Sequence, residues 1–231
     1  MDRPDHSALL ARRQRLLELA ASLASLSLPT GQPRAQSPAG RTPTPAQSLG
    51  PFYPRAASER PRETDADLLR AQGAGELLAR GVPLFLAGRV SHRAGAPLPG
   101  ALIEIWQCDA NAVYHHPAGG ALAERDPNFQ GYGRALADAE GRFAFRTIRP
   151  VPYPGRTPHI HLRVEAAGLR TLGTQLYLAG EPGNERDFLY RSLDAAERAA
   201  LTLTLAPTPS GATHPLASGT RFMAATELVL V

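Results

Sequence analysis

The chain has 231 residues, of which 43% are hydrophobic and 20% are charged; this balance is typical of a globular protein and excludes an intrinsically disordered one. Its formal net charge is +4, but the arginines are scattered, without a basic helix or a stripe of basic and aromatic residues, which argues against nucleic-acid binding. The single cysteine, Cys108, excludes an intramolecular disulfide framework and a cysteine-rich zinc site.

Residues 1–36 allow two interpretations. Arg12-Arg13, an apolar run from Leu16 to Leu28 and the segment Pro33-Arg34-Ala35 are similar to a twin-arginine export signal cleaved near Ala35. Glu18 inside the run and Pro33 at the cleavage site argue against export, and the leucines also recur at the spacing of an amphipathic helix. We therefore expect either a periplasmic protein with a cleaved signal or a cytoplasmic one with an N-terminal helix. The run is too short and too rich in serine for a membrane span.

Residues 37–81 are predicted to form an extended arm or linker, because Pro, Ser, Thr and Gln are frequent in the segment's first part. From residue 82 to residue 231 the pattern predicts a β-domain. Three pairs of strand-like segments follow one another, with Gly-, Pro- or Asp-containing loops or turns inside each pair. The pairs are 82–91 with 101–107, 133–137 with 142–147, and 158–165 with 171–178.

Residues 186–201 are predicted to form a helix with Leu193, Ala196, Ala200 and Leu201 on its inner face. Segments 201–205 and 228–231 would complete the sheets. We therefore expect a mainly β protein, an antiparallel β-sandwich with long functional loops and a short helical N-terminal segment. Loops 108–131 and 149–157 are too long for simple turns, and long ordered loops on a sandwich commonly carry function.

The most informative stretch is Tyr153-Pro154-Gly155-Arg156-Thr157-Pro158-His159-Ile160-His161. Because side chains alternate along a strand, His159 and His161 would point to the same side. Tyr153 lies in a loop whose prolines restrict the backbone. We interpret the stretch as a cluster for one metal ion and one anionic substrate, although two exposed histidines and a packed tyrosine would also explain it.

Tyr114 follows the segment 101–107 and is a further candidate ligand, while His115 and His116 are rivals that, being adjacent, would point in different directions. Thiolates would favour zinc or copper, and carboxylates magnesium or calcium. A deprotonated phenol is a hard anionic donor that suits Fe(III), and a bound metal lowers the pKa of tyrosine from its usual value of about 10. Two phenols and two imidazoles therefore favour a ferric ion.

These residues resemble the intradiol ring-cleavage dioxygenases, a family that includes the protocatechuate 3,4-dioxygenases and smaller single-domain relatives. The matching segments occur in the family's order over residues 44–190. They are Gly50-Pro51-Phe52-Tyr53, Gly100-Ala101-Leu102-Ile103-Glu104-Ile105-Trp106-Gln107, Asp126-Pro127-Asn128-Phe129, Pro152-Tyr153-Pro154, Pro158-His159-Ile160-His161 and Thr174-Gln175-Leu176-Tyr177.

The resemblance implies a non-haem Fe(III) centre held by Tyr114, Tyr153, His159 and His161 in a catalytic β-sandwich domain over residues 82–231. It implies that Tyr153 leaves the metal when substrate binds, and that Arg156 and Gln175 orient the substrate and stabilise its charge. The reaction implied is cleavage of a catechol-type ring by O₂ between its two hydroxyl-bearing carbons, to give a muconate-type diacid, as in aromatic hydrocarbon catabolism.

Two features depart from the family. Better-known members carry a tryptophan after the Tyr-Pro pair, where this chain has Gly155 and a shorter loop, so the choice among protocatechuate, catechol and substituted catechols stays open. The protocatechuate enzymes also pair two different chains; here the sequence indicates no partner, and an oligomer stays open.

The alternatives are non-catalytic or use another metal. A transthyretin-like β-sandwich binding module would make the Tyr and His set a coincidence. A cupin would need a Glu and a third His at positions where the chain has only Glu165, at the edge of a turn, and His214, in the C-terminal tail.

Overall fold

The computed structural model describes residues 40–60, 64–70 and 78–231, and the predictions for residues 1–36 therefore lie outside the described residues. The described residues belong to one compact unit. Among them, no helix combines the length and the apolar character needed to cross a membrane.

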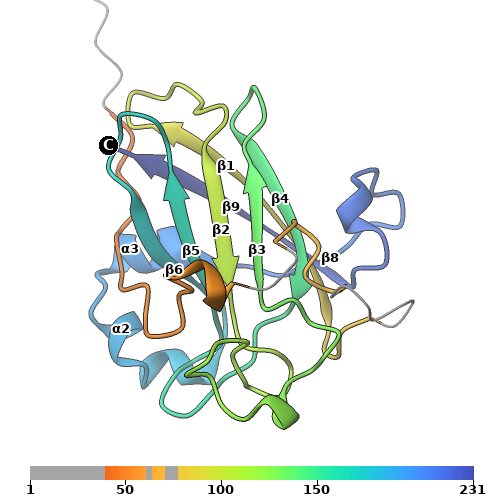
Figure 1. The fold of residues 1–231 in the computed structure, drawn as a ribbon. Coiled ribbons are helices and arrows are strands. Elements are labelled where there is room, and N and C mark those ends of the chain that lie inside the picture. Colours follow the sequence, from red (N-terminus) through yellow and green to blue (C-terminus); the bar gives the residue numbers. More distant parts are fainter. Residues whose placement is uncertain (1–39, 61–63, 71–77) are drawn as a thin grey trace, which may run out of the picture. The chain divides into compact units, whose positions relative to one another are not determined.

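Two β-sheets pack face to face (Figure 1). The sheet we name sheet A has the order β4-β1-β9-β8, and sheet B has the order β3-β2-β5-β6-β7. The strands of sheet A are β1 (Pro83–His92), β4 (Arg142–Ile148), β8 (Ala206–Pro207) and β9 (Phe222–Leu230). Those of sheet B are β2 (Leu102–Trp106), β3 (Tyr132–Leu136), β5 (His159–Glu165), β6 (Leu172–Leu178) and β7 (Thr202–Leu203).

The alternation of side chains along these strands builds the core between the sheets. Leu84 and Leu86 of β1 meet Ile103 and Ile105 of β2 and Ile160 of β5, and all five are fully buried. Burial of each such side chain stabilises the fold by about 1.5–3 kcal/mol. The other face of sheet B is turned away from this core and presents polar and aromatic side chains: Glu104, Trp106, His159, His161 and Gln175.

The predicted mainly β sandwich is confirmed, with corrections to its connections. The pairs β1–β9 and β6–β7 are parallel, so the sheets are mixed and not purely antiparallel. β5 and β6 pair as neighbours, as predicted, but neither β1 and β2 nor β3 and β4 form a hairpin, because each of these pairs is divided between the two sheets. Gly and Asp residues indicate that the chain turns sharply, but they do not determine which sheet the next strand joins.

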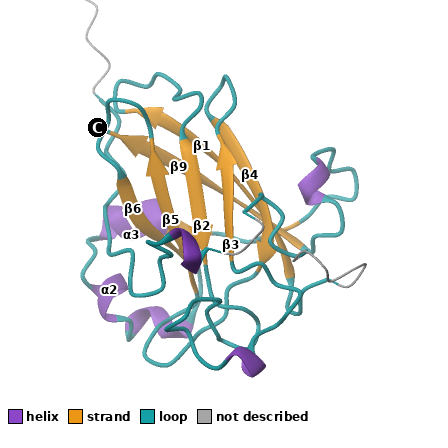
Figure 2. Cartoon of the chain, in the orientation of Figure 1, coloured by secondary structure: helices purple, strands orange, loops and turns teal. Residues whose placement is uncertain are grey.

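The predicted helix over 186–201 is wrong in its continuity. The structure has two short helices, α2 (Phe188–Arg191) and α3 (Ala195–Leu201), each begun by an aspartate that accepts backbone N–H groups. Asp194 forms a capping box with Glu197, which starts a new helix where the pattern predicted an uninterrupted one. Leu193 and Leu201 are buried as predicted, whereas Ala196 and Ala200 are exposed. Apart from the short 3-10 helix Ala57–Glu59, which precedes β1, the helical segments of the described residues lie in connections between strands (Figure 2).

Residues 40–53 run from sheet A to sheet B. Thr44 donates its N–H to the Val229 carbonyl (3.0 Å) and accepts the Val229 N–H at its hydroxyl (2.8 Å), while the Gln47 N–H reaches the Gly173 carbonyl (2.8 Å). The arm thus follows β9 and then β6, and it carries residues 47–53 onto the outer face of sheet B. The division of the chain into segments 1–36, 37–81 and 82–231 stays a prediction.

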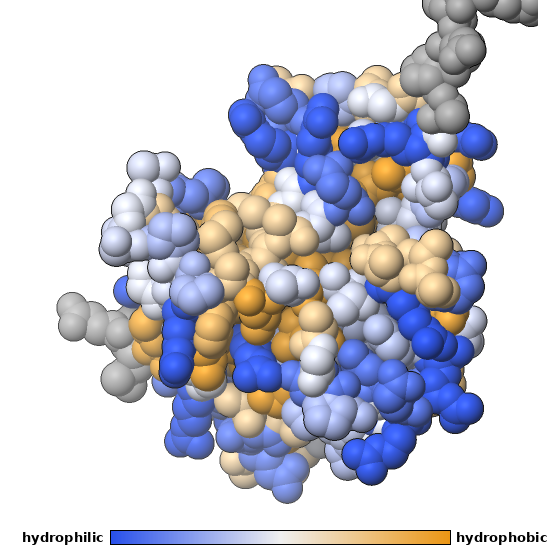
Figure 3. Space-filling view, turned by 180° about the vertical axis from the view of Figure 1, so that it is seen from behind, coloured by the Kyte–Doolittle hydropathy of each residue, from blue (hydrophilic) through white to orange (hydrophobic). Residues whose placement is uncertain are grey.

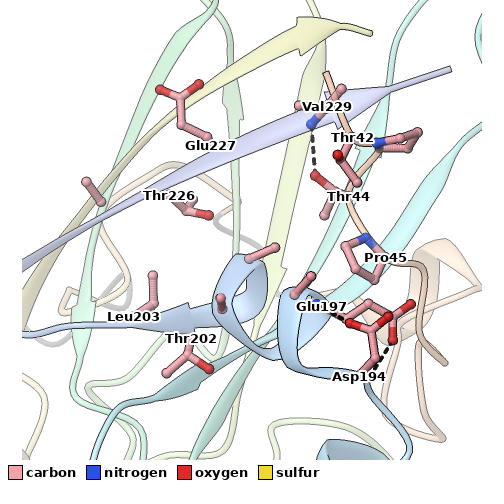
Figure 4. Close-up of a pocket in the computed structure, with 15 residues that line it drawn as sticks. Thr42, Thr44, Pro45, Asp194, Glu197, Thr202, Leu203, Thr226, Glu227 and Val229 are labelled. Atoms are coloured by element: carbon pink, nitrogen blue, oxygen red, sulfur yellow. Dashed lines mark hydrogen bonds between the residues drawn. The ribbon is translucent and has the colours of Figure 1, made fainter. Parts of the chain in front are cut away.

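A groove of about 610 Å³ lies between residues 42–45, α3 and β9 (Figure 4). Its lining includes small apolar side chains such as Ala199 and Ala225, and the carboxylates of Asp194, Glu197 and Glu227. The view from behind shows apolar surface interrupted by charged side chains (Figure 3). None of the six residues predicted to form the site lines this groove.

Candidate metal centre

β5 places His159 and His161 on the outer face of sheet B. Both are almost completely buried, at 2% and 1% exposure, and their Nε2 atoms lie 3.2 Å apart. The Nδ1 atom of His159 contacts the Thr157 carbonyl oxygen at 2.7 Å, which is the contact of an N–H donor. That tautomer leaves the Nε2 lone pair of His159 available to a metal.

Tyr114 reaches the same point from the loop that follows β2. Its hydroxyl oxygen lies 3.5 Å from His159 Nε2, and the side chain is 3% exposed. The loop is organised by the buried carboxylate of Asp109, which accepts the N–H groups of Asn111 (2.9 Å), Val113 (3.0 Å) and Asp126 (2.7 Å). A fully buried acceptor with three backbone donors therefore holds Tyr114 in place.

Tyr153 lies beside Tyr114, with its ring edge-on at a centroid distance of 5.4 Å. It is half-buried and belongs to a tight turn in which the Arg156 N–H donates to the Tyr153 carbonyl (2.9 Å). The turn brings the Arg156 guanidinium back to the phenol, with Nη1 3.4 Å from the Tyr153 hydroxyl oxygen. Nη2 donates to Gln175 Oε1 at 2.6 Å. Arg156 thus connects Tyr153 to Gln175.

An aromatic cluster surrounds these groups. Phe52 stacks on Tyr114 (4.3 Å between centroids), and Trp106 stacks on His161 (4.9 Å) with the rings 5° from parallel. Tyr53 packs on Trp106 at 4.9 Å. Residues 49–53 therefore form one wall of the site, and because they precede residue 82 the predicted β-domain alone would not contain that wall.

Burial sets the protonation of the four candidate ligands. It raises the pKa of Tyr114 well above its usual value and, against the opposing effect of Arg156, also raises the pKa of Tyr153. It lowers the pKa of His159 to about 4 and brings that of His161 well below its usual value, with the neighbouring imidazole of His159 adding to the shift in His161. Without a metal, the site therefore consists of neutral phenols and neutral imidazoles at pH 7.

The residues present fit a ferric ion by two observations. His159 Nε2 lies 3.2 Å from His161 Nε2 and 3.5 Å from the Tyr114 hydroxyl oxygen, with the Tyr153 ring beside them. His161 Nδ1 is buried and has no hydrogen-bond partner, so no contact at this nitrogen opposes the tautomer in which Nε2 presents its lone pair. Within the described ranges, no group of three or more His, Cys, Asp or Glu side chains is arranged to hold a metal.

The rival histidines are engaged elsewhere. His115 lies 3.1 Å from an oxygen of Asp109, and His116 has the carboxylate of Glu59 at 3.8 Å. The sequence reasoning overlooked Asp187, whose buried carboxylate lies 2.7 Å from Arg156 Nε. Its signal was available, because an aspartate directly before an apolar helical run is typical of a helix N-cap.

The chain is similar to known dioxygenases. A family model described as Dioxygenase matches residues 50–218. The β chain of protocatechuate 3,4-dioxygenase from Burkholderia cepacia is 38% identical over 127 residues, which are 51% of this chain and 54% of that one. Hydroxyquinol 1,2-dioxygenase from Rhodococcus opacus is 33% identical over 168 residues, or 65% of this chain and 51% of the relative. The chain spans about half the length of these curated relatives.

Among solved structures, the fold matches the dioxygenase domain of a dioxygenase and carbohydrate-binding protein fusion from Streptomyces sp. SirexAA-E. The TM-score is 0.57 at 33% sequence identity, and the match covers 82% of this chain and 98% of that one. The family model and these relatives agree with one another and with the β-sandwich. The chain belongs to the intradiol ring-cleavage dioxygenase family.

Proposed function

We propose that this protein is a non-haem Fe(III) intradiol dioxygenase that cleaves a catechol-type ring between its two hydroxyl-bearing carbons. The observation that carries the proposal is the convergence of Tyr114, His159 and His161 at one buried point, with Tyr153 beside them. Family membership supports the same reaction class.

Tyr114, Tyr153, His159 and His161 would hold the iron. Two phenolates and two neutral imidazoles suit a hard trivalent cation, and binding would reverse the effect of burial on the tyrosine pKa values. A bound ferric ion would supply Lewis acidity that lets both catechol hydroxyls ionise and that activates the ring toward O₂.

The protein's own groups would receive and orient the substrate. Tyr153 is half-buried whereas Tyr114 is 3% exposed, so Tyr153 is the phenol with room to move aside and accept a proton from the catechol. Arg156 Nη1, 3.4 Å from the Tyr153 hydroxyl, would stabilise the Tyr153 phenolate until it accepts that proton, and then the negative charge on the substrate ring. Gln175, which binds Nη2, would keep the guanidinium in that direction.

The substrate class is a catechol. The relatives act on protocatechuate, hydroxyquinol and catechol by name, and these compounds share the 1,2-dihydroxybenzene unit. A Cβ placed on Gly155 would have no atom within 4 Å, so the turn leaves open space beside Tyr153 and Arg156. We infer that ring substituents on the side of Gly155 are tolerated.

The test is a visible absorption spectrum of the purified protein after ferric reconstitution, recorded before and after anaerobic addition of catechol. We expect a tyrosinate-to-Fe(III) band that shifts when catechol is added without O₂. When O₂ is then admitted, we expect its uptake and formation of the ring-opened diacid. Protocatechuate and hydroxyquinol, assayed in parallel, rank the substrates.

Ligand variants make the assignment specific. Tyr153→Phe and His161→Ala should each weaken the band or abolish iron binding, whereas His214→Ala, which changes an exposed histidine of the C-terminal tail, should keep the band. Full ring cleavage by either of the first two variants would disprove the ligand assignment. A protein that stays colourless after reconstitution would instead favour the non-catalytic binding module.

A further inference from the structure

Asp187 is a buried carboxylate just outside the candidate metal centre. Its side chain is fully buried, and its two oxygens have different partners. Oδ1 accepts the N–H groups of Leu189 and Tyr190 at 3.0 Å each and so caps α2. Oδ2 accepts from Arg156 Nε at 2.7 Å and from the Thr157 N–H at 3.0 Å. One oxygen therefore suffices for the helix, and the other is directed at the site.

The contact with Arg156 sets the direction of its guanidinium. A guanidinium is a rigid planar fork, so a fixed Nε determines where the remaining nitrogens point. With Nε bound to Asp187, Nη1 faces the Tyr153 hydroxyl at 3.4 Å and Nη2 faces Gln175 at 2.6 Å. The Phe188 ring lies 5.5 Å from the guanidinium carbon and restricts it further. Asp187 and Gln175 thus hold the cation from two sides.

The contact with Thr157 reaches His159. Thr157 donates its backbone N–H to Asp187, and its carbonyl oxygen contacts His159 Nδ1 at 2.7 Å. The Thr157 hydroxyl donates to Asn184 Oδ1 at 2.8 Å, which anchors the residue from the opposite direction. The same carboxylate therefore supports the residue that orients the His159 ring.

We propose that Asp187 is a positioning residue that holds Arg156 and, through Thr157, His159 in the geometry needed for ring cleavage. This inference rests on the proposed function, because it assigns Asp187 a part in that reaction. A buried carboxylate also keeps the partly buried Arg156 charge paired, which leaves the guanidinium less free to turn toward solvent.

Asp187→Asn, made in the full chain, is the first test. The amide retains one oxygen for capping α2 but presents N–H groups where Oδ2 met two donors. Loss of one charge-assisted hydrogen bond corresponds to roughly a tenfold to hundredfold change, and we expect kcat to fall by about that factor with KM changed less than threefold. Asp187→Ser gives a second variant, because serine is a good N-cap that cannot reach Arg156.

Asp194→Asn is the matched control. Asp194 caps α3 through the Glu197 N–H, as Asp187 caps α2, but its side chain makes no contact with Arg156 or Thr157. We expect this variant to keep wild-type kcat. An equal loss in Asp194→Asn would mean that helix capping alone explains the effect, and the positioning role would be rejected.

The decisive measurement is a double-mutant cycle with Arg156→Ala. If Asp187 acts through Arg156, Asp187→Asn should lower the residual kcat of the Arg156→Ala protein by less than threefold. The same cycle in urea unfolding of the iron-free protein supplies a readout that does not depend on activity. There, Asp187→Asn should lower the unfolding midpoint in the wild-type background and have a smaller effect when Arg156 is absent.

The outcomes separate the two proposals. Multiplicative losses in kcat together with additive shifts in the unfolding midpoint would overturn the positioning of Arg156 by Asp187, whatever the activity of the wild type. A wild-type protein without ring cleavage would overturn the proposed function, and coupling in the unfolding cycle would then show that Asp187 positions Arg156 without serving this reaction.

Discussion

Trp106 and His161 lie flat against each other, with ring centroids 4.9 Å apart and planes 5° from parallel. They are paired across β2 and β5, so the sheet register itself produces the stack. His161 Nδ1 has no hydrogen-bond partner, in contrast to His159 Nδ1, which contacts a backbone carbonyl. Packing on Trp106 therefore orients His161, where a hydrogen bond orients His159.

Trp106→Leu should test this difference. The substitution removes the flat surface under His161 and leaves a cavity, so we expect a loss of about 2–4 kcal/mol in the free energy of unfolding and a weaker ferric affinity. Trp106→Phe keeps an aromatic face under His161 and should therefore retain more of the stability and more of the ferric affinity than Trp106→Leu. Urea unfolding and iron content per chain measure the two effects. A Leu variant that binds iron as tightly as the Phe variant would contradict the role of the stack.

Gly50→Ala should disturb the same histidine from the wall formed by residues 49–53. Gly50 has a φ of +70°, and a Cβ there would lie 3.2 Å from His161 Cε1. We expect a stability loss of about 1 kcal/mol from the left-handed backbone. The contact should in addition shift the His161 ring by a few tenths of an ångström and weaken iron binding. Iron titration of the purified variant measures that second effect.

Gly168→Ala is the control for the backbone effect. Gly168 has a φ of +75°, and a Cβ there would have no atom within 4 Å. This variant should lose a similar amount of stability and keep wild-type iron affinity. Equal iron affinities in the two variants would show that the contact with His161 is unimportant.

Glu104 should make the protein sensitive to acid. Its carboxyl is buried, which by itself raises the pKa, but hydrogen bonds from Tyr132, Arg163 and Tyr53 bring the pKa below its usual value. The ionised form is thus favoured in the folded state. Its stabilising contribution is complete above the unfolded pKa of about 4.5 and is lost as the pH falls through the lower folded value. Urea unfolding from pH 7 to pH 3 should show this loss.

Glu104→Gln should reduce that dependence on pH. At pH 7 the variant breaks a buried pair with Arg163 and should lose about 3 kcal/mol of stability, and below pH 4.5 its curve should approach that of the wild type. Glu140→Gln changes an exposed carboxylate paired with Arg142 and should follow the wild-type curve. If the unfolding free energies of Glu104→Gln and the wild type differed by the same amount at every pH from 7 to 3, Glu104 would be excluded as the source of the acid sensitivity.

The strands were predictable because their residues alternate. The His159-Ile160-His161 segment lies on β5 with both imidazoles on one face, as period-2 alternation requires. The partner of each strand was not predictable, because β1 pairs with β4 and β9, both far along the chain. Such pairings depend on how the apolar faces of the two sheets pack together. The residues of the local turns do not specify that packing.

The site was predictable where one segment carries it and less so where several segments meet. Tyr153, Arg156, His159 and His161 lie within nine residues, so their proximity follows from chain geometry. That Tyr114 lies 3.5 Å from His159 depends on a loop folded around Asp109, which spacing alone does not reveal. The contact between Asp187 and Arg156 joins residues 31 positions apart and requires the tertiary fold.

Ala112→Gly should stabilise the loop that carries Tyr114. Ala112 has a φ of +64°, the only positive φ at a non-glycine residue in the parts of the chain that the structure describes. A Cβ in this region costs about 1 kcal/mol, partly offset by the greater freedom of glycine in the unfolded chain. We expect a net gain of about 0.5 kcal/mol in the free energy of unfolding, with iron binding retained. Ala121→Gly, at an ordinary φ of −68°, should instead lose stability. A loss in both variants, measured by urea unfolding, would show that the loop holds Ala112 without strain.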